Sequence, residues 1–167
     1  MTKYELPEKC ANMTVHFLYG TAPSNPDSVI AYLKEKKYAL IADLVNEGLT
    51  KEKIEQAVRE DKVKVAPVSS KRMSDLFWLP EYESELEEMA KKAQKLCGGD
   101  CKDGNAPIGG DVLSLGADFD SQQLALVALT YAAHKGYVKE TEIDRGAGVG
   151  PLFVSSESPL IKLLGIE

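Results

Sequence analysis

The sequence predicts an α+β fold: a predominantly helical single domain with a small mixed or antiparallel sheet and one fully buried helix. Residues 121–135 are apolar around almost the whole helical circumference, as in a helix buried on all sides. Several short runs of β-branched, aromatic or alternating residues end at Gly or Pro, as strands do. A length of 167 residues fits one domain, in which a helical N-terminal part (1–97) and a C-terminal part (98–167) pack as one unit.

The first elements are a strand and a helix. The β-branched and aromatic run 13–19 predicts a short strand that stops at a glycine. Asn25 followed by proline predicts the start of a helix, whose apolar residues continue as far as Gly48, a glycine suited to a C-terminal cap. The charged cluster 34–37 within this stretch is either a solvated face or a break in the helix.

Three further elements are expected before residue 98. Thr50 predicts the N-cap of a second helix, and the alternation over 62–68 predicts a half-buried strand, which Pro67 places at a sheet edge. We expect residues 70–78 to be helical. Pro80 opens a surface helix with acids in its first turns and lysines in its last, and the double glycine at 98–99 ends it.

The last part of the chain contains the helix expected to form the core. Residues 98–120 show little regular pattern apart from a possible short strand at 112–115. Asp120 resembles an N-cap for the buried helix 121–135, and a glycine ends that helix. Two more strands are expected, at 137–143 and 152–155, and residues 160–164 would dock the C-terminus.

Composition excludes several functional classes. The formal net charge is -6 and the pI is near 5.1, so no basic face is apparent and we expect no nucleic-acid partner. No apolar run approaches the roughly 20 residues of a membrane helix, and the N-terminal residues do not resemble a signal peptide. We therefore expect a cytoplasmic protein with no membrane partner. The acidic excess lies in residues 111–167, which carry 8 acidic and 4 basic side chains.

The glycine-rich segment 145–150 is the candidate anion site. Glycines free successive backbone N–H groups to hold a phosphate or carboxylate, and an arginine can add a bidentate contact. The residues concerned are Arg145, Gly146, Gly148 and Gly150. The spacing is not that of a dinucleotide-binding motif, and the alternative is a tight connection that needs positive φ.

Two thiols form a weak candidate metal site. Cys97 and Cys101 have a spacing that occurs in zinc sites, but a second pair of ligands is missing, so we expect no metal there. No combination of nucleophile, base and acid is apparent from spacing, and His134 is better explained as a structural residue at a helix end. The catalytic residues, if any, and the cofactors remain unidentified by the sequence.

Two segments suggest macromolecular contacts. The predicted helices on either side of Gly48 have the outline of a helix-turn-helix, but counting residues 51–61 makes the second helix net negative, which argues against DNA binding. Phe77, Trp78 and Tyr82 concentrate aromatic side chains near an element end. Such residues are enriched at protein interfaces, and packing in the core is the alternative explanation.

Three functions are consistent with these observations. The first is a non-catalytic subunit or accessory protein of a larger soluble assembly, with other subunits or a second copy as partner. The second is a small enzyme or binding protein for an anionic small molecule held by the glycine-rich loops. The third, which the charge argues against, is a helix-turn-helix regulator. The sequence favours the first.

Overall fold

The computed structural model describes residues 28–67, 75–98, 110–144, 146, 148–158 and 161. The chain divides into two compact units, Met1–Glu83 (unit 1) and Ser84–Glu167 (unit 2). The α+β class is confirmed: helices predominate, and the strands form one three-stranded and one two-stranded antiparallel sheet. The expected single domain stays a prediction, and the two units divide before residue 84 rather than after residue 97.

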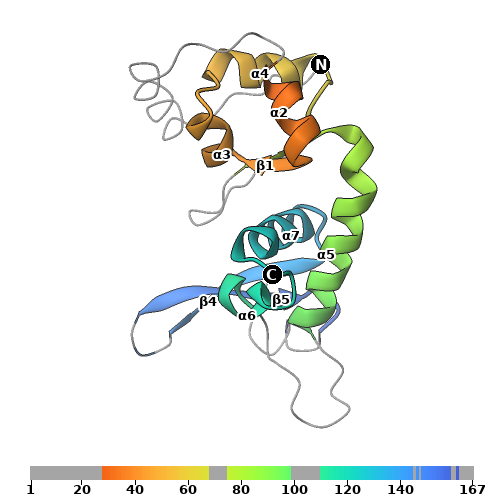
Figure 1. Cartoon of the computed structure of the whole chain (residues 1–167). Helices are drawn as coiled ribbons and strands as arrows, with labels where there is room; N and C mark the ends of the chain where they lie inside the picture. The colour runs from red at the N-terminus through yellow and green to blue at the C-terminus, as the bar shows by residue number, and fades with distance from the viewer. Residues whose placement is uncertain are drawn as a thin grey trace. The chain divides into compact units, whose positions relative to one another are not determined.

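Unit 1 contains a three-stranded sheet, and Figure 1 shows helices α2, α3 and α4 with strand β1. Strand β3 is central and pairs antiparallel with β1 on one side and β2 on the other, with Phe77 opposite both Ala39 and Val65. The elements in chain order are α2 (Ser28–Lys36), β1 (Tyr38–Leu40), α3 (Ile41–Asn46), α4 (Lys51–Arg59), β2 (Lys64–Ala66) and β3 (Leu76–Trp78).

The helix expected to continue to Gly48 is interrupted, so the alternative of a break at the charged cluster is confirmed. Lys37 adopts a positive φ of 74°, and β1 follows it directly. Helix α3 then begins at Ile41, where the Asp43 carboxylate accepts a hydrogen bond from the Leu40 N–H at 3.0 Å. Gly48, with φ 81°, ends the helical stretch as expected. The expected strand 13–19 and the expected start of the first helix lie outside the described residues.

Two predictions for the rest of unit 1 are confirmed and one is wrong. Thr50 caps α4, its hydroxyl oxygen accepting from the Lys53 N–H at 3.4 Å, and β2 is an edge strand. The helix expected at 70–78 is wrong for its described part, because Leu76–Trp78 is the central strand β3. All three of its residues are buried, and a strand covered on both faces shows no alternation that distinguishes it from a helix.

A hydrophobic core joins helices α2, α3 and α4 to the three-stranded sheet. Phe77 lies at its centre, together with residues from α2, α3 and α4. The principal buried members are Val29, Leu33, Ile41, Leu44, Val45, Ile54, Ala57 and Val63. This core fixes α3 and α4 to the sheet and therefore fixes which face of α4 is left outside.

The described part of unit 2 contains helices α5, α6 and α7 and the β4–β5 hairpin (Figure 1). Helix α5 (Glu83–Cys97) follows a short 3₁₀ helix, η1 (Pro80–Tyr82), and confirms the predicted surface helix with its end at Gly98. The other elements are α6 (Val112–Gly116), α7 (Gln122–His134), β4 (Val138–Asp144) and β5 (Val149–Ser155). The two predicted strands are thus confirmed as the paired strands β4 and β5.

Two predictions in the α6–α7 region are wrong. The strand expected at 112–115 is helix α6, because the Asp111 carboxylate accepts from the Ser114 N–H at 2.6 Å and so caps a helix. Asp120 is not the cap of α7: it has a positive φ of 63°, and the Ser121 hydroxyl accepts from the Leu124 N–H at 3.0 Å instead. A short apolar run does not by itself distinguish a strand from a helix.

The prediction of a buried helix is confirmed for the middle of α7. Every residue from Val127 to Ala132 is at most 1% exposed. The ends differ, since Gln122, Gln123 and His134 are exposed. Within this apolar environment the Thr130 hydroxyl donates to the Leu126 carbonyl at 2.6 Å, which satisfies its polar group.

The two units share one connectivity, although the sequence shows no internal repeat. In each, a helix leads to a short extended segment, a second helix, a turn, a third helix and two antiparallel strands. In unit 1 the extended segment is β1, which pairs with β3. In unit 2 it is Gly110, which forms an antiparallel bridge to Phe153 of β5. The last strand is therefore central in both units, and the third helices, α4 and α7, occupy equivalent places in the connectivity.

Candidate nucleic-acid interface

Helices α3 and α4 of unit 1 form a helix-turn-helix that is anchored from within. The turn is held by the Gly48 N–H, which donates to the Val45 carbonyl at 2.9 Å, and by the Leu49 N–H, which donates to the Leu44 carbonyl at 3.2 Å. Thr50 then caps α4. These local bonds, with the buried apolar residues of both helices, set the direction of α4 before any ligand is present.

Helix α4 has a buried face and an outer face. Ile54 and Ala57 are buried in the core, whereas Glu52 and Gln56, four residues apart, are exposed on one side. Arg59 is also exposed, and its guanidinium lies 3.6 Å from the buried Glu55 carboxylate. The outer face of α4 therefore presents polar side chains on a helix that the core holds in place.

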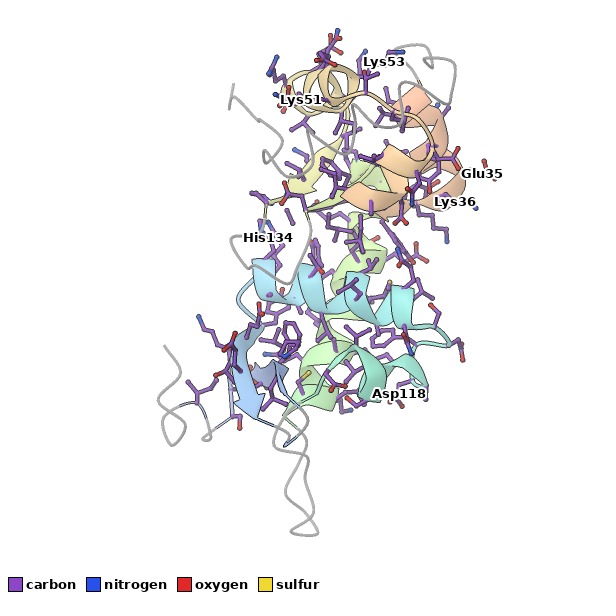
Figure 2. The ribbon with its side chains drawn as sticks, turned by 90° about the vertical axis from the view of Figure 1, so that its left-hand side faces the viewer. Glu35, Lys36, Lys51, Lys53, Asp118 and His134 are labelled. Carbon is purple, nitrogen blue, oxygen red and sulfur yellow. The ribbon has the colours of Figure 1, made fainter. Side chains whose placement is uncertain are left out.

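Three lysines follow the turn of the helix-turn-helix in the described part of unit 1. Lys51 and Lys53 lie in the first turn of α4, and Lys64 begins the edge strand β2. Among the described residues none of the three has a carboxylate within ion-pair distance. Figure 2 shows Lys51 and Lys53 on α4, well separated from Glu35 and Lys36 on α2. Unpaired ammonium groups at a helix-turn-helix are the side chains that neutralise phosphates.

The net charge of residues 51–72 differs from the net charge of residues 51–61, which the sequence analysis counted as the second helix. Helix α4 ends at Arg59, so Glu60 and Asp61, which made the sequence count negative, lie beyond it. Glu60 is also paired with Lys62 at 3.3 Å. From residue 51 to residue 72 the chain carries seven basic and four acidic residues. Two of the basic residues, Lys71 and Arg72, belong to the connection between β2 and β3 and lie outside the described residues.

The equivalent region of unit 2 has the opposite character. The third helix there, α7, is apolar and largely buried. The turn that precedes it carries Asp118 and Asp120, both exposed. Unit 2 as a whole has eight basic and thirteen acidic residues, against twelve and thirteen in unit 1. Within one chain, the same connectivity thus supplies one polar third helix with basic neighbours and one apolar third helix with acidic neighbours.

The glycine-rich segment is the loop of the β4–β5 hairpin. Asp144 pairs with Val149, so residues 145–148 form the connection. Gly146 and Gly148 have φ values of 83° and 143°, and a Cβ at either would meet nothing within 4 Å. Glycine is needed there for the backbone conformation and not for close approach of another group. Gly150 lies in β5 opposite Ile143, and Arg145 lies outside the described residues, so the described geometry favours a tight connection.

Two residues of the aromatic cluster, Phe77 and Trp78, lie on strand β3 and are buried. Phe77 is fully buried in the core of unit 1 and Trp78 is 2% exposed, which favours core packing over an interface for these two residues. Tyr82 is partly buried, and its hydroxyl donates to the Lys34 carbonyl at 3.4 Å. Tyr82 therefore ties the end of unit 1 to helix α2.

Of the cysteine and histidine candidates, the structure describes Cys97 and His134. Cys97 is buried, and burial raises the pKa of its thiol to about 12, while Cys101 lies outside the described residues. His134 is exposed at the end of α7. No three His, Cys, Asp or Glu side chains in the described ranges are placed as the ligands of one metal ion. None of the helices described combines the length and apolar character needed to cross a membrane.

Comparison with known proteins adds no relative: no protein family matches the chain, and no curated protein or solved structure matches it either. The connectivity therefore stands by itself. In the described residues of unit 1, helices α2, α3 and α4 accompany a sheet of order β1-β3-β2, and the antiparallel pair β2–β3 follows α4. In DNA-binding proteins with a helix-turn-helix the second of the two helices lies in the major groove, and α4 has that place in the order of elements here.

Sequence reasoning identified the outline of this site but not its basic residues. The helix-turn-helix was apparent from Gly48 and Thr50. Lys64 was missed as a candidate member, because it follows α4 in the sequence and lies on the edge strand β2. The available signal was the run of basic residues in the predicted edge strand and the segment after it.

Proposed function

We propose that the chain is a non-catalytic DNA-binding protein, in which unit 1 binds duplex DNA with α4 in the major groove. The observation that carries this proposal is a core-anchored helix-turn-helix with Lys51 and Lys53 in the first turn of its second helix and Lys64 on the strand that follows, none of them with an ion-pair partner among the described residues. Phosphate neutralisation by such lysines supplies the sequence-independent part of DNA affinity.

The overall charge of -6 does not oppose this binding. Salt screens exposed charges separated by more than about 8–10 Å, so the charges nearest the DNA matter most. The described residues 51–67, which include α4 and β2, carry five basic and four acidic side chains. The proposal thus departs from the expectation of no nucleic-acid partner, which was based on the charge of the whole chain and of an overlong helix.

The salt dependence of binding tests this proposal. The affinity of the full chain for a fluorescent duplex is measured by anisotropy from low to physiological salt. Each lysine that neutralises one phosphate contributes about 0.9 to the slope of log K against log salt. Changing Lys51, Lys53 and Lys64 together to Gln is therefore expected to reduce the slope by about 2.7 and to weaken binding of every duplex.

A matched triple variant gives the control. Lys91, Lys95 and Lys135 are exposed lysines of unit 2, and their replacement by Gln changes the net charge by the same amount. Binding is expected to change little in this variant. Equal weakening by the two variants, or no binding of duplex DNA at low salt, would contradict the proposal.

A role in an assembly is the second candidate, favoured by unit 2. Its third helix is apolar and its neighbouring turn is acidic, so this unit does not offer the chemistry of a DNA contact. We propose that unit 2 joins the DNA-bound protein to other subunits or to a second copy in the cytoplasm. The free buried thiol of Cys97 is compatible with that reducing compartment. Native mass and co-purifying proteins, compared for the full chain with and without DNA, test this role.

A further inference from the structure

Gln56 occupies the outer face of α4 in a pre-arranged conformation. Its side chain is exposed, and its Nε2 donates a hydrogen bond to the Glu60 Oε1 at 3.2 Å. The other carboxylate oxygen of Glu60 lies 3.3 Å from the Lys62 ammonium. A chain of contacts from Lys62 through Glu60 to Gln56 therefore restrains an amide that would otherwise rotate freely in solvent.

The Glu60 carboxylate keeps its charge in this arrangement. The hydrogen bond from Gln56, followed by the contacts with Lys62, lowers the pKa of Glu60 below its ordinary value. An ionised carboxylate only accepts hydrogen bonds, so it fixes which end of the Gln56 amide faces it: the nitrogen, not the oxygen.

The remaining groups of the amide match one base. A glutamine amide has two N–H donors and one carbonyl acceptor, and Glu60 engages one donor. One N–H and the carbonyl oxygen are left without a partner among the described residues. Adenine presents the complementary pair in the major groove, an N7 acceptor beside an N6 donor, and glutamine binds this pair in a bidentate manner.

We propose that Gln56 selects an A·T base pair in the DNA site, and that Glu60 is a positioning residue for it. This inference rests on the proposed function, because it requires α4 to lie in the major groove. The free lysines at the start of α4 and on β2 contact phosphates in this arrangement and carry no sequence preference.

Selection from a randomised duplex pool tests the inference with the full-length chain. The wild-type protein is expected to enrich a motif with one A·T pair at a fixed position. Replacing that pair should weaken wild-type binding by about 5- to 150-fold, the range for one bidentate contact. Gln56→Ala should bind all four base pairs at that position about equally, and Glu60→Ala should reduce the discrimination in part.

Two controls separate this role from a general loss of binding. Lys53→Gln should weaken all duplexes by a similar factor and leave the motif unchanged. Gln123→Ala alters an exposed glutamine of α7 and should change neither affinity nor motif. Circular dichroism verifies that each variant folds, as expected for exposed positions.

The outcomes distinguish this inference from the proposed function. If the wild-type protein binds DNA without a base preference, or Gln56→Ala retains the A·T preference, the inference is overturned and DNA binding by unit 1 stands. If no duplex is bound at low salt, both are overturned. A selected A·T pair that Gln56→Ala no longer distinguishes supports both.

Discussion

Replacing Gly98 by alanine is expected to destabilise unit 2, because Gly98 lies against β5. A Cβ built on Gly98 would lie 2.3 Å from the Ser155 Cβ and 3.1 Å from its Oγ. Ser155 is buried, and its Oγ accepts a hydrogen bond from the Glu157 N–H at 3.2 Å, so it cannot move aside without loss. Overpacking of this kind costs about 1–3 kcal/mol.

Part of that cost is offset in the unfolded chain. Alanine restricts the unfolded backbone and so stabilises the folded state by about 0.4–1 kcal/mol, which leaves a net loss of about 1–2 kcal/mol. For a domain the size of Ser84–Glu167, each kcal/mol lowers Tm by about 4–8 °C. The expected decrease for Gly98→Ala is therefore about 4–16 °C, measured by thermal and urea unfolding of the full chain followed by circular dichroism.

A second substitution tests the cause. Ser155→Gly removes the atom that the new methyl group meets, so the double variant should recover most of the loss relative to Ser155→Gly alone. Gly146→Ala is the control: its φ is positive but its surroundings are open, and Ser155→Gly should not rescue it. Unchanged or increased stability of Gly98→Ala, or no recovery in the double variant, would refute the close approach of Gly98 to β5.

Three other predictions concern caps, titration and a lysine contact. Thr50→Ala should destabilise unit 1 by about 1 kcal/mol in urea unfolding, and Thr50→Ser should not, since it keeps the capping oxygen. The pKa of the Cys97 thiol is about 12 in the folded state against 9.0 ordinarily. Its contribution to the free energy of unfolding should therefore be complete below pH 9 and lost as pH rises towards 12. Urea unfolding compared at pH 8 and pH 10 should show this decrease for the wild type, and Cys97→Ala should lack it. The Lys92 ammonium donates to the Asp118 carbonyl at 2.5 Å and lies 4.6 Å from the Phe119 ring centroid. Lys92→Met removes both contacts and should lower the free energy of thermal unfolding by about 1 kcal/mol, whereas Lys92→Arg should lower it less.

Local signals in the sequence were enough for the elements with clear ends. The cap at Thr50, the surface helix that ends at Gly98 and the buried helix 121–135 depend on neighbouring residues, and the structure confirms them. The pattern of apolar residues predicted the wrong kind of element where the element is very short. Leu76–Trp78 gains its strand conformation from β1 and β2, which pair with it from distant parts of the chain. No window around these residues contains that information.

The candidate site was predicted in outline only. Its helix-turn-helix depends on local capping, whereas its charge depends on which residues surround α4 after folding. Lys64 is included in the candidate site because it lies on β2, the strand that follows α4. Glu60 is not counted among the residues of α4, because that helix ends at Arg59. The repeated connectivity was invisible for a related reason: α4 and α7 have equivalent places but opposite polarity, so no sequence similarity remains to detect.

That repeated connectivity bears on how the chain avoids misfolding. A polypeptide that contains the same arrangement twice risks exchanging elements between its halves while it folds, as in domain swapping. Here the two third helices cannot substitute for one another, since α4 would bring Glu52 and Gln56 into the apolar surroundings of α7, and α7 would expose Val127–Ala132 in the place of α4. The difference in polarity between α4 and α7 therefore disfavours an exchange of these two helices between the units during folding.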